Sequence, residues 1–219
     1  MKGLSSAKEN TLKKIRQALT NSVPVPFPQS EGKVSVFQPL QKDLELEFAE
    51  NFTGLLGKFS FCMDEQELAE QLQMLCKSKN LTSIYCRENF LVETLTKNGF
   101  STFNSNSVAE CDASITGCEL LVARTGSLLM SSAQQSGRTV SVYAPIHICI
   151  AYTNQLVYDI KEGLQLLLKK YAGNMPSLIT LASGPSRTAD IEKTLVVGVH
   201  GPKEVYVFLV EGSKPVAPK

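Results

Sequence analysis

The residues best suited to chemistry lie together between Ser183 and Pro202. This stretch contains two Gly-Pro pairs together with an arginine, a histidine, an aspartate and a glutamate, and apolar runs precede and follow it. Glycine and proline mark turns, and loops held between strands are common positions for binding residues. The stretch therefore predicts ligand-binding loops. Two plain turns, with polar side chains that act as caps, are the alternative.

The first part of this stretch, Gly184-Pro-Ser-Arg-Thr188, has the composition of an anion site. It follows an expected strand and leads toward residues 189–192, which we expect to form a short helix. Backbone N–H groups at such a turn favour a phosphate or a carboxylate. Ser186 and Thr188 would add hydroxyl donors, and Arg187 a bidentate guanidinium. No lysine follows in P-loop spacing, which excludes that class of nucleotide site. The alternative is that a hydroxyl only caps the helix.

The second part supplies candidate acid–base groups. His200, in Gly198-Val-His-Gly-Pro202, is a candidate general acid or base near neutral pH, or else a hydrogen-bonded structural residue. Asp190 and Glu192 are candidate catalytic carboxylates, although two residues apart on a helix they would point to different faces. A structural ion pair from Asp190 to Arg187 or Arg138 is the alternative. His147 lies inside an apolar run and is a weaker candidate.

A third candidate segment is Thr125-Gly126-Ser127, which separates two apolar runs. A glycine at this position would let a ligand approach the backbone closely. A plain hairpin turn is the alternative.

Composition excludes several classes of function. The net charge of +1 over 219 residues gives no electrostatic reason to expect nucleic acid or an anionic membrane as partner. No apolar stretch reaches the roughly 20 residues that a membrane span needs, and no secretory h-region is visible, so we expect a cytoplasmic protein. The six cysteines form no C-x-x-C pair, and we therefore expect no zinc and no iron–sulfur cluster in this chain.

The elements that must position these residues follow from the apolar pattern. A helix is expected at 5–19 and a proline-bearing linker at 20–42; the main domain then covers 43–211, and a polar tail 212–219. Helices and strands alternate over 44–98, which predicts an α/β fold with a mostly parallel sheet and right-handed crossovers. Further short strands are expected at 114–116, 120–124, 127–131, 139–143 and 147–151, and a long helix at 154–171.

Taken together, Gly184–Glu192 and Gly198–Pro202 strongly resemble the LUD-domain family, the lactate-utilisation protein C-like group. Ile115–Gly117, Thr125–Ser127, Arg138, and Pro145 with His147 also match, and the resemblance covers about residues 43–211. One departure is Arg124, because the family usually has an acidic residue before Thr-Gly.

The resemblance implies a Rossmann-like fold of the ribose-5-phosphate isomerase and CoA-transferase-like group, with ligand loops at the carboxyl ends of parallel strands. It also implies a part in oxidising L-lactate to pyruvate beside partner proteins that carry iron–sulfur clusters. This chain would then be an accessory or substrate-binding subunit that binds a small anionic ligand. A free-standing isomerase or CoA-transferase-like enzyme, acting on a phosphorylated or acyl substrate, and a non-catalytic interaction module remain alternatives. The candidate ligand-binding residues are Thr125, Gly126, Ser127, Arg138, Gly184, Ser186, Arg187 and Thr188.

Overall fold

The computed structural model describes residues 6–20, 40, 42–189 and 195–213, and the chain divides into two units, 1–39 and 40–219. The first unit contains helix α1 (Ser6–Thr20), which confirms the helix expected at 5–19. The described side chains of α1 are exposed, apart from the half-buried Leu12. Most of the expected linker, and most of the expected tail, lies outside the described residues.

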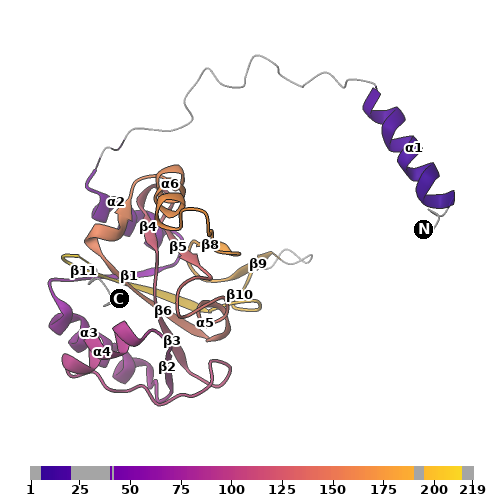
Figure 1. The fold of residues 1–219 in the computed structure, drawn as a ribbon. Coiled ribbons are helices and arrows are strands. Elements are labelled where there is room, and N and C mark those ends of the chain that lie inside the picture. Colours follow the sequence, from indigo (N-terminus) through magenta and orange to yellow (C-terminus); the bar gives the residue numbers. More distant parts are fainter. Residues whose placement is uncertain (1–5, 21–39, 41, 190–194, 214–219) are drawn as a thin grey trace. The chain divides into compact units, whose positions relative to one another are not determined.

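The second unit is built on a five-stranded parallel sheet (Figure 1). Its strand order is β1 (Lys58–Cys62), β11 (Glu204–Val210), β6 (Ile146–Tyr152), β3 (Ala113–Gly117) and β2 (Ile84–Cys86). Every neighbouring pair of strands is parallel, which confirms the mostly parallel sheet that the sequence predicts. Helices α3 (Glu65–Lys79) and α4 (Asn89–Lys97) cover one face, where apolar side chains of the strands and the helices form a single core.

Local sequence signals fix the ends of these two helices. The Asp64 carboxylate accepts a hydrogen bond from the backbone N–H of Glu67 at 2.8 Å, which caps the start of α3. In return, the Glu67 carboxylate accepts one from the N–H of Met63 at 2.7 Å. After α4, Gly99 has a φ of +91°, a conformation that suits glycine at the end of a helix.

A second sheet covers the opposite face together with helix α2 (Leu44–Gly54). Its strand order is β7 (Leu156–Val157), β4 (Leu120–Val122), β5 (Ser127–Ser131) and β8 (Ile179–Ala182). Strand β5 is antiparallel to β4 and to β8. Phe48 and Phe52 of α2 stack at 5.4 Å and are buried against Cys149 and Val207 of the central sheet. Helix α6 (Ile160–Lys170) packs on β4 and β7.

Two expected elements are wrong in this region. Four of the five residues expected to form a strand at 139–143 form the short helix α5 (Val140–Tyr143). The helix expected at 154–171 begins only at Ile160, where the Asp159 carboxylate accepts a hydrogen bond from the N–H of Lys161 at 2.9 Å. The residues before it form the 3₁₀ turn η2 (Thr153–Gln155) and strand β7.

The segment after β8 also differs from the expectation. Of the short helix expected at 189–192, only Ala189 is described, and it ends strand β9 (Arg187–Ala189), which pairs antiparallel with β10 (Leu195–Val197). The candidate anion loop is therefore the start of a hairpin. Among the helices of the described residues, none is both long and apolar enough to cross a membrane.

Candidate functional site

The two halves of the predicted motif meet at the base of the β9–β10 hairpin. The backbone N–H of Ser186 donates to the carbonyl of Pro202 at 2.9 Å, and the N–H of Gly198 donates to the carbonyl of Ser186 at 2.9 Å. Arg187 lies opposite Val197 in the strand register. Residues ten to sixteen positions apart in the chain are thus held side by side.

The same geometry corrects the predicted form of the anion site. The Ser186 N–H is already bonded to Pro202, and Arg187 to Ala189 are in a strand, so no helix N-terminus faces a ligand at this position. Arg187 is exposed and Thr188 is half-buried. Asp190 and Glu192 lie outside the described residues, and their catalytic role stays a prediction.

A surface pocket of about 420 Å³ lies beside this hairpin base. Its lining comes from α5, from the residue before β6, and from the segment between β10 and β11: Val142, Tyr143, Pro145, Gly198, Val199, His200, Gly201 and Lys203. Since β6 and β11 begin at Ile146 and Glu204, the pocket lies at the amino ends of these parallel strands. The resemblance implies ligand loops at carboxyl ends of strands, and this pocket lies at the other end of β6 and β11.

Two of the polar side chains that line the pocket, His200 and Lys203, carry nitrogen groups. No carboxylate of the described residues forms an ion pair with either of them. Glu204 follows Lys203 but is bound to Lys58 and Lys79. Burial alone would raise the pKa of Glu204, but the hydrogen bonds from its partners lower that pKa to about 2. The positive charge of Lys203 thus remains available to a ligand.

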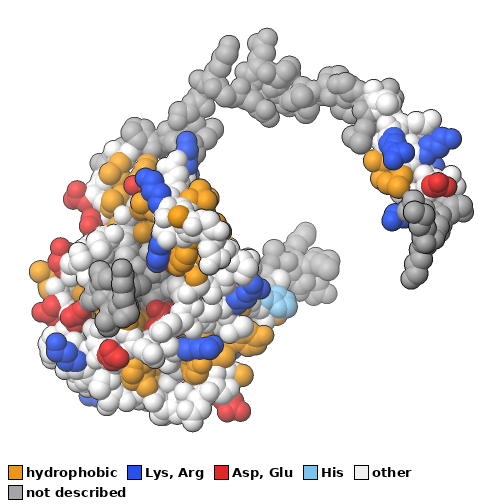
Figure 2. All heavy atoms as spheres, in the orientation of Figure 1, with side chains coloured by type: hydrophobic (Ala, Val, Ile, Leu, Met, Phe, Trp, Pro, Cys, Tyr) orange, Lys and Arg blue, Asp and Glu red, His pale blue; other side chains and the backbone are white. Residues whose placement is uncertain are grey.

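Figure 2 shows one face of the molecule, on which a histidine side chain, in pale blue, is exposed. Blue lysine or arginine side chains and orange apolar side chains lie around it. Val142, Tyr143 and Val199 are exposed apolar residues of the pocket lining.

Two glycines set the shape of the pocket wall. Gly198 has a φ of +80°, and a Cβ there would lie 2.2 Å from Cγ of Lys203. A Cβ on Gly201 would lie 2.9 Å from Cβ of Ser186. Side chains at these positions would push away the lysine stem and the hairpin base. The glycines therefore let Lys203 and Ser186 reach their observed places.

Three further candidate residues form a separate cluster near the end of α2. The Ser127 hydroxyl donates to Thr125 Oγ1 at 2.8 Å and lies 2.6 Å from the hydroxyl of Ser183. Ser127 is 2% exposed. The cluster joins the start of β5 to the end of β8.

Helix α2 occupies the space around this cluster. A Cβ on Gly126, where φ is +55°, would lie 2.5 Å from the backbone nitrogen of Phe52. A Cβ on Gly184 would lie 2.5 Å from the carbonyl oxygen of Leu55. Asn51 also donates to the carbonyl of Ala123 at 3.0 Å. The close approach predicted at Gly126 is therefore made by the protein's own backbone.

The two remaining arginines of interest are engaged elsewhere. Arg138 donates to the Ser177 hydroxyl near the start of β8 and is not among the residues that line the pocket. Arg124 forms an ion pair with Asp159 at 2.6 Å. The basic residue at this position thus binds the N-cap of α6.

His147 is a buried structural residue. Its Nε2 lies 2.8 Å from the Thr116 hydroxyl, and only 1% of the residue is exposed. Burial lowers its pKa to about 4, so the ring is neutral near pH 7.

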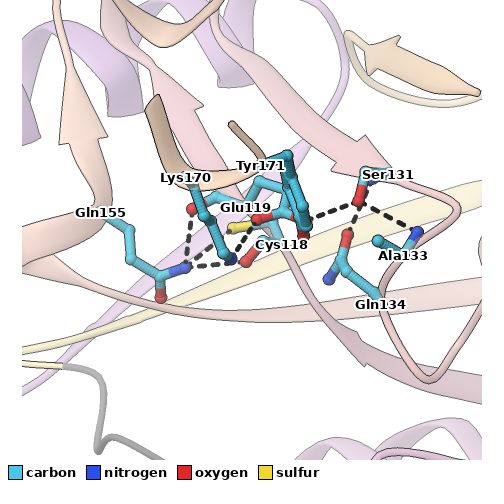
Figure 3. Close-up of polar contacts among 8 residues, drawn as sticks. All are labelled: Cys118, Glu119, Ser131, Ala133, Gln134, Gln155, Lys170 and Tyr171. Carbon is cyan, nitrogen blue, oxygen red and sulfur yellow. Dashed lines mark hydrogen bonds and ion pairs between the residues drawn. The ribbon is translucent and has the colours of Figure 1, made fainter. Parts of the chain in front are cut away.

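A buried carboxylate that the sequence patterns did not indicate is Glu119 (Figure 3). Its Oε1 accepts hydrogen bonds from the hydroxyls of Ser131 at 2.5 Å and Tyr171 at 2.6 Å, and its Oε2 accepts one from Lys170 at 2.6 Å. Burial acts to raise its pKa, and these donors outweigh burial and lower it. Both oxygens are thus bound by the protein itself, and the network ties the end of α6 to β5.

The described residues contain no group of three or more histidine, cysteine, aspartate or glutamate side chains that could hold a metal ion. No disulfide joins any of the six cysteines, all of which belong to the described part of the chain, and all but Cys86 are buried. Burial raises the pKa of Cys62 to about 12, so its thiol is protonated at neutral pH.

Known proteins with similar sequences match about half of this chain. An uncharacterised protein of Neisseria meningitidis is 33% identical over 112 residues, which are 50% of this chain and 46% of that protein. Lactate utilization protein C of Deinococcus radiodurans is 35% identical over 100 residues, 45% of this chain and 46% of the relative. That of Bacillus subtilis is 32% identical over 109 residues, 49% of this chain and 45% of the relative. The chain thus spans about half the length of the curated relatives it matches.

The fold has a solved counterpart. The crystal structure of a DUF162 family protein from Deinococcus radiodurans superposes with a TM-score of 0.58, covering 78% of this chain and 99% of that one, at 19% identity. The family model of the LUD domain matches residues 46–210, which include both sheets, the pocket lining and the buried Glu119 network. By that match, the chain belongs to the LUD-domain family.

Proposed function

We propose that this protein takes part in lactate utilisation and binds a small carboxylate in the pocket beside His200. The role in lactate utilisation is supported by the names of its relatives from Deinococcus radiodurans and Bacillus subtilis. The pocket supports the ligand class, because it combines the cationic Lys203 with the imidazole of His200.

The chemistry of the pocket fits a hydroxy or oxo acid. The Lys203 ammonium is a compact charge that would bind the carboxylate. The His200 imidazole would bind the neighbouring hydroxyl or oxo group and could accept or donate its proton. Oxidation of lactate also needs an electron acceptor, and we propose that partner proteins with iron–sulfur clusters supply it. In this arrangement the present chain binds and presents the acid.

Ligand binding is tested by thermal unfolding of the full chain with L-lactate, pyruvate and a sugar phosphate. At a ligand concentration of 100 times the Kd, binding stabilises the folded state by about 2.7 kcal/mol. For a chain of this size we expect the Tm to rise by about 5–10 °C. Lys203→Ala should remove this rise, whereas Lys169→Ala, which removes an exposed lysine of α6, should keep it.

Three outcomes would contradict the proposal. A Tm that responds to none of the acids would exclude the ligand class. A rise that Lys203→Ala and His200→Asn both retain would place the binding site elsewhere. A response to the sugar phosphate alone would favour an enzyme of the isomerase-like group instead.

The partner proposal needs a separate experiment. Affinity purification of the tagged chain from its own cells, grown on lactate, should recover proteins that contain iron and acid-labile sulfide. Recovery of the chain without any iron-containing protein would contradict this part of the proposal.

A further inference from the structure

We infer that the His200 pocket selects carboxylates whose apolar body is larger than that of lactate, namely α-hydroxy or α-oxo acids with a longer, branched or aromatic side chain. This inference rests on the proposed function, because it concerns the ligand of the same pocket. It goes further by stating which part of the ligand determines affinity.

The size of the pocket is the first reason. Its volume is about 420 Å³, within the range of about 300–1,000 Å³ that holds drug-sized ligands. Lactate has a three-carbon skeleton and would fill a small part of this space. A larger body is needed to displace the remaining water from the apolar walls.

The distribution of apolar residues is the second reason. On the α5 side, Val142 is 39% exposed and Tyr143 is 64% exposed, with Pro145 beside them; on the hairpin side, Val199 is 54% exposed. Large apolar side chains exposed together mark surfaces that bind ligands or partners. Tyr143 also offers a flat ring against which an apolar or aromatic group can pack.

The distribution of polar groups is the third reason. Among the described residues of the lining, Lys203 carries the one permanent positive charge, and His200 lies two residues after Gly198 on the same wall. A ligand with a single anionic end and an apolar body matches both features. A sugar phosphate would place several hydroxyls against valine, proline and tyrosine side chains, where unbonded polar groups are costly. The lining therefore favours an amphipathic acid over a sugar phosphate.

The inference is tested by calorimetric titration of the full chain with lactate, α-hydroxybutyrate, α-hydroxycaproate and phenyllactate. Each methylene buried in the pocket should lower the Kd about fourfold, which corresponds to about 0.8 kcal/mol. Phenyllactate should bind more than tenfold more tightly than lactate. Tyr143→Ser and Val199→Ser should reduce this gradient, and since both residues are exposed we expect these variants to fold.

A matched control is Leu181→Ser, which removes an exposed apolar side chain of β8 outside the pocket and should keep the full gradient. Equal Kd values across the series would overturn the inference and leave carboxylate binding intact. A gradient that both pocket variants retain would also overturn it, because the apolar contacts would lie elsewhere. Absence of binding by every acid would contradict the proposed function itself.

Discussion

Acidification should destabilise the fold through His147. The side chain is 1% exposed, and burial lowers its pKa from an ordinary value of 6.5 to about 4. The unfolded chain therefore takes up a proton near pH 6.5, whereas the folded chain does so only near pH 4. The stabilisation is complete above pH 6.5 and is lost as the pH falls from 6.5 to about 4.

The magnitude follows from the distance between the two pKa values. At about 1.4 kcal/mol per pH unit, the free energy of unfolding should fall by about 3 kcal/mol across the whole interval. Between pH 7 and pH 5 the fall should be about 2 kcal/mol. That upper part of the interval is informative because ordinary carboxylates, with pKa values near 4, are still ionised there.

The assay is urea unfolding of the full chain at several pH values between 7.5 and 5. His147→Gln keeps an amide for the Thr116 hydroxyl and removes the titration, so its curve should be flat in this range even if the variant is less stable overall. His200→Gln removes the chain's other histidine, which is exposed, and should retain the slope of the parent. Equal slopes for the parent and His147→Gln would refute the reasoning.

Three further changes test other parts of the fold. Glu119→Ala should lower the free energy of unfolding by about 3 kcal/mol in urea, because two hydroxyls and an ammonium lose their buried acceptor; a loss below about 1 kcal/mol would show that the network is dispensable. Gly126→Ala should destabilise far more than Gly137→Ala in thermal unfolding, since both have positive φ but only the first would bring a Cβ against the backbone of α2. Deletion of residues 1–20 should leave the Tm within about 2 °C of the full chain, because residues 1–39 form a unit of their own; a larger drop would contradict this.

The sequence predicted the first half of the main unit well because local signals mark its elements. Helices and strands were expected to alternate over 44–98, and they do. The side chain of Asp64 caps helix α3, and Gly99 follows helix α4 with a positive φ. These signals act within a few residues, so they can be recognised without knowledge of the fold. The parallel sheet then followed from the alternation of strands and helices.

Apolar spacing alone failed where neighbouring elements share one buried face. Leu156 fits the apolar stripe of α6, but it lies in strand β7. A buried leucine is common in helices and in strands, so its residue type does not distinguish the two. Asp159 and Glu162 mark the true start of the helix: the side chain of Asp159 caps it, and that of Glu162 accepts from the N–H of Tyr158 at 3.1 Å. This capping pattern lay inside the expected helix and was overlooked. The alternation over 139–143 likewise suggested a strand for what is a short helix.

Of the candidate site, the sequence could predict the motif but not the pocket beside it. The spacing of glycine, proline and polar residues indicated that 183–202 matters, and the hydrogen bonds of Ser186 show why its two halves belong together. The sequence alone could not show that the pocket is lined by Val142, Tyr143 and Lys203. Helix α5 lies far from the hairpin in sequence, and only the tertiary fold brings the two together. Glu119 was overlooked for the same reason, because one of its partners, Tyr171, is 52 positions away.

The base of the β9–β10 hairpin also determines where occupancy of the pocket can be observed. Its two hydrogen bonds, from Ser186 to Pro202 and from Gly198 to Ser186, hold the wall that carries His200. Amide protons in such bonds exchange with solvent when the segment opens locally, and a bound ligand that contacts this wall opposes the opening. Slower deuterium uptake at the amides of Ser186 and Gly198 would therefore report an occupied pocket even for a ligand too weak to shift the unfolding of the whole chain.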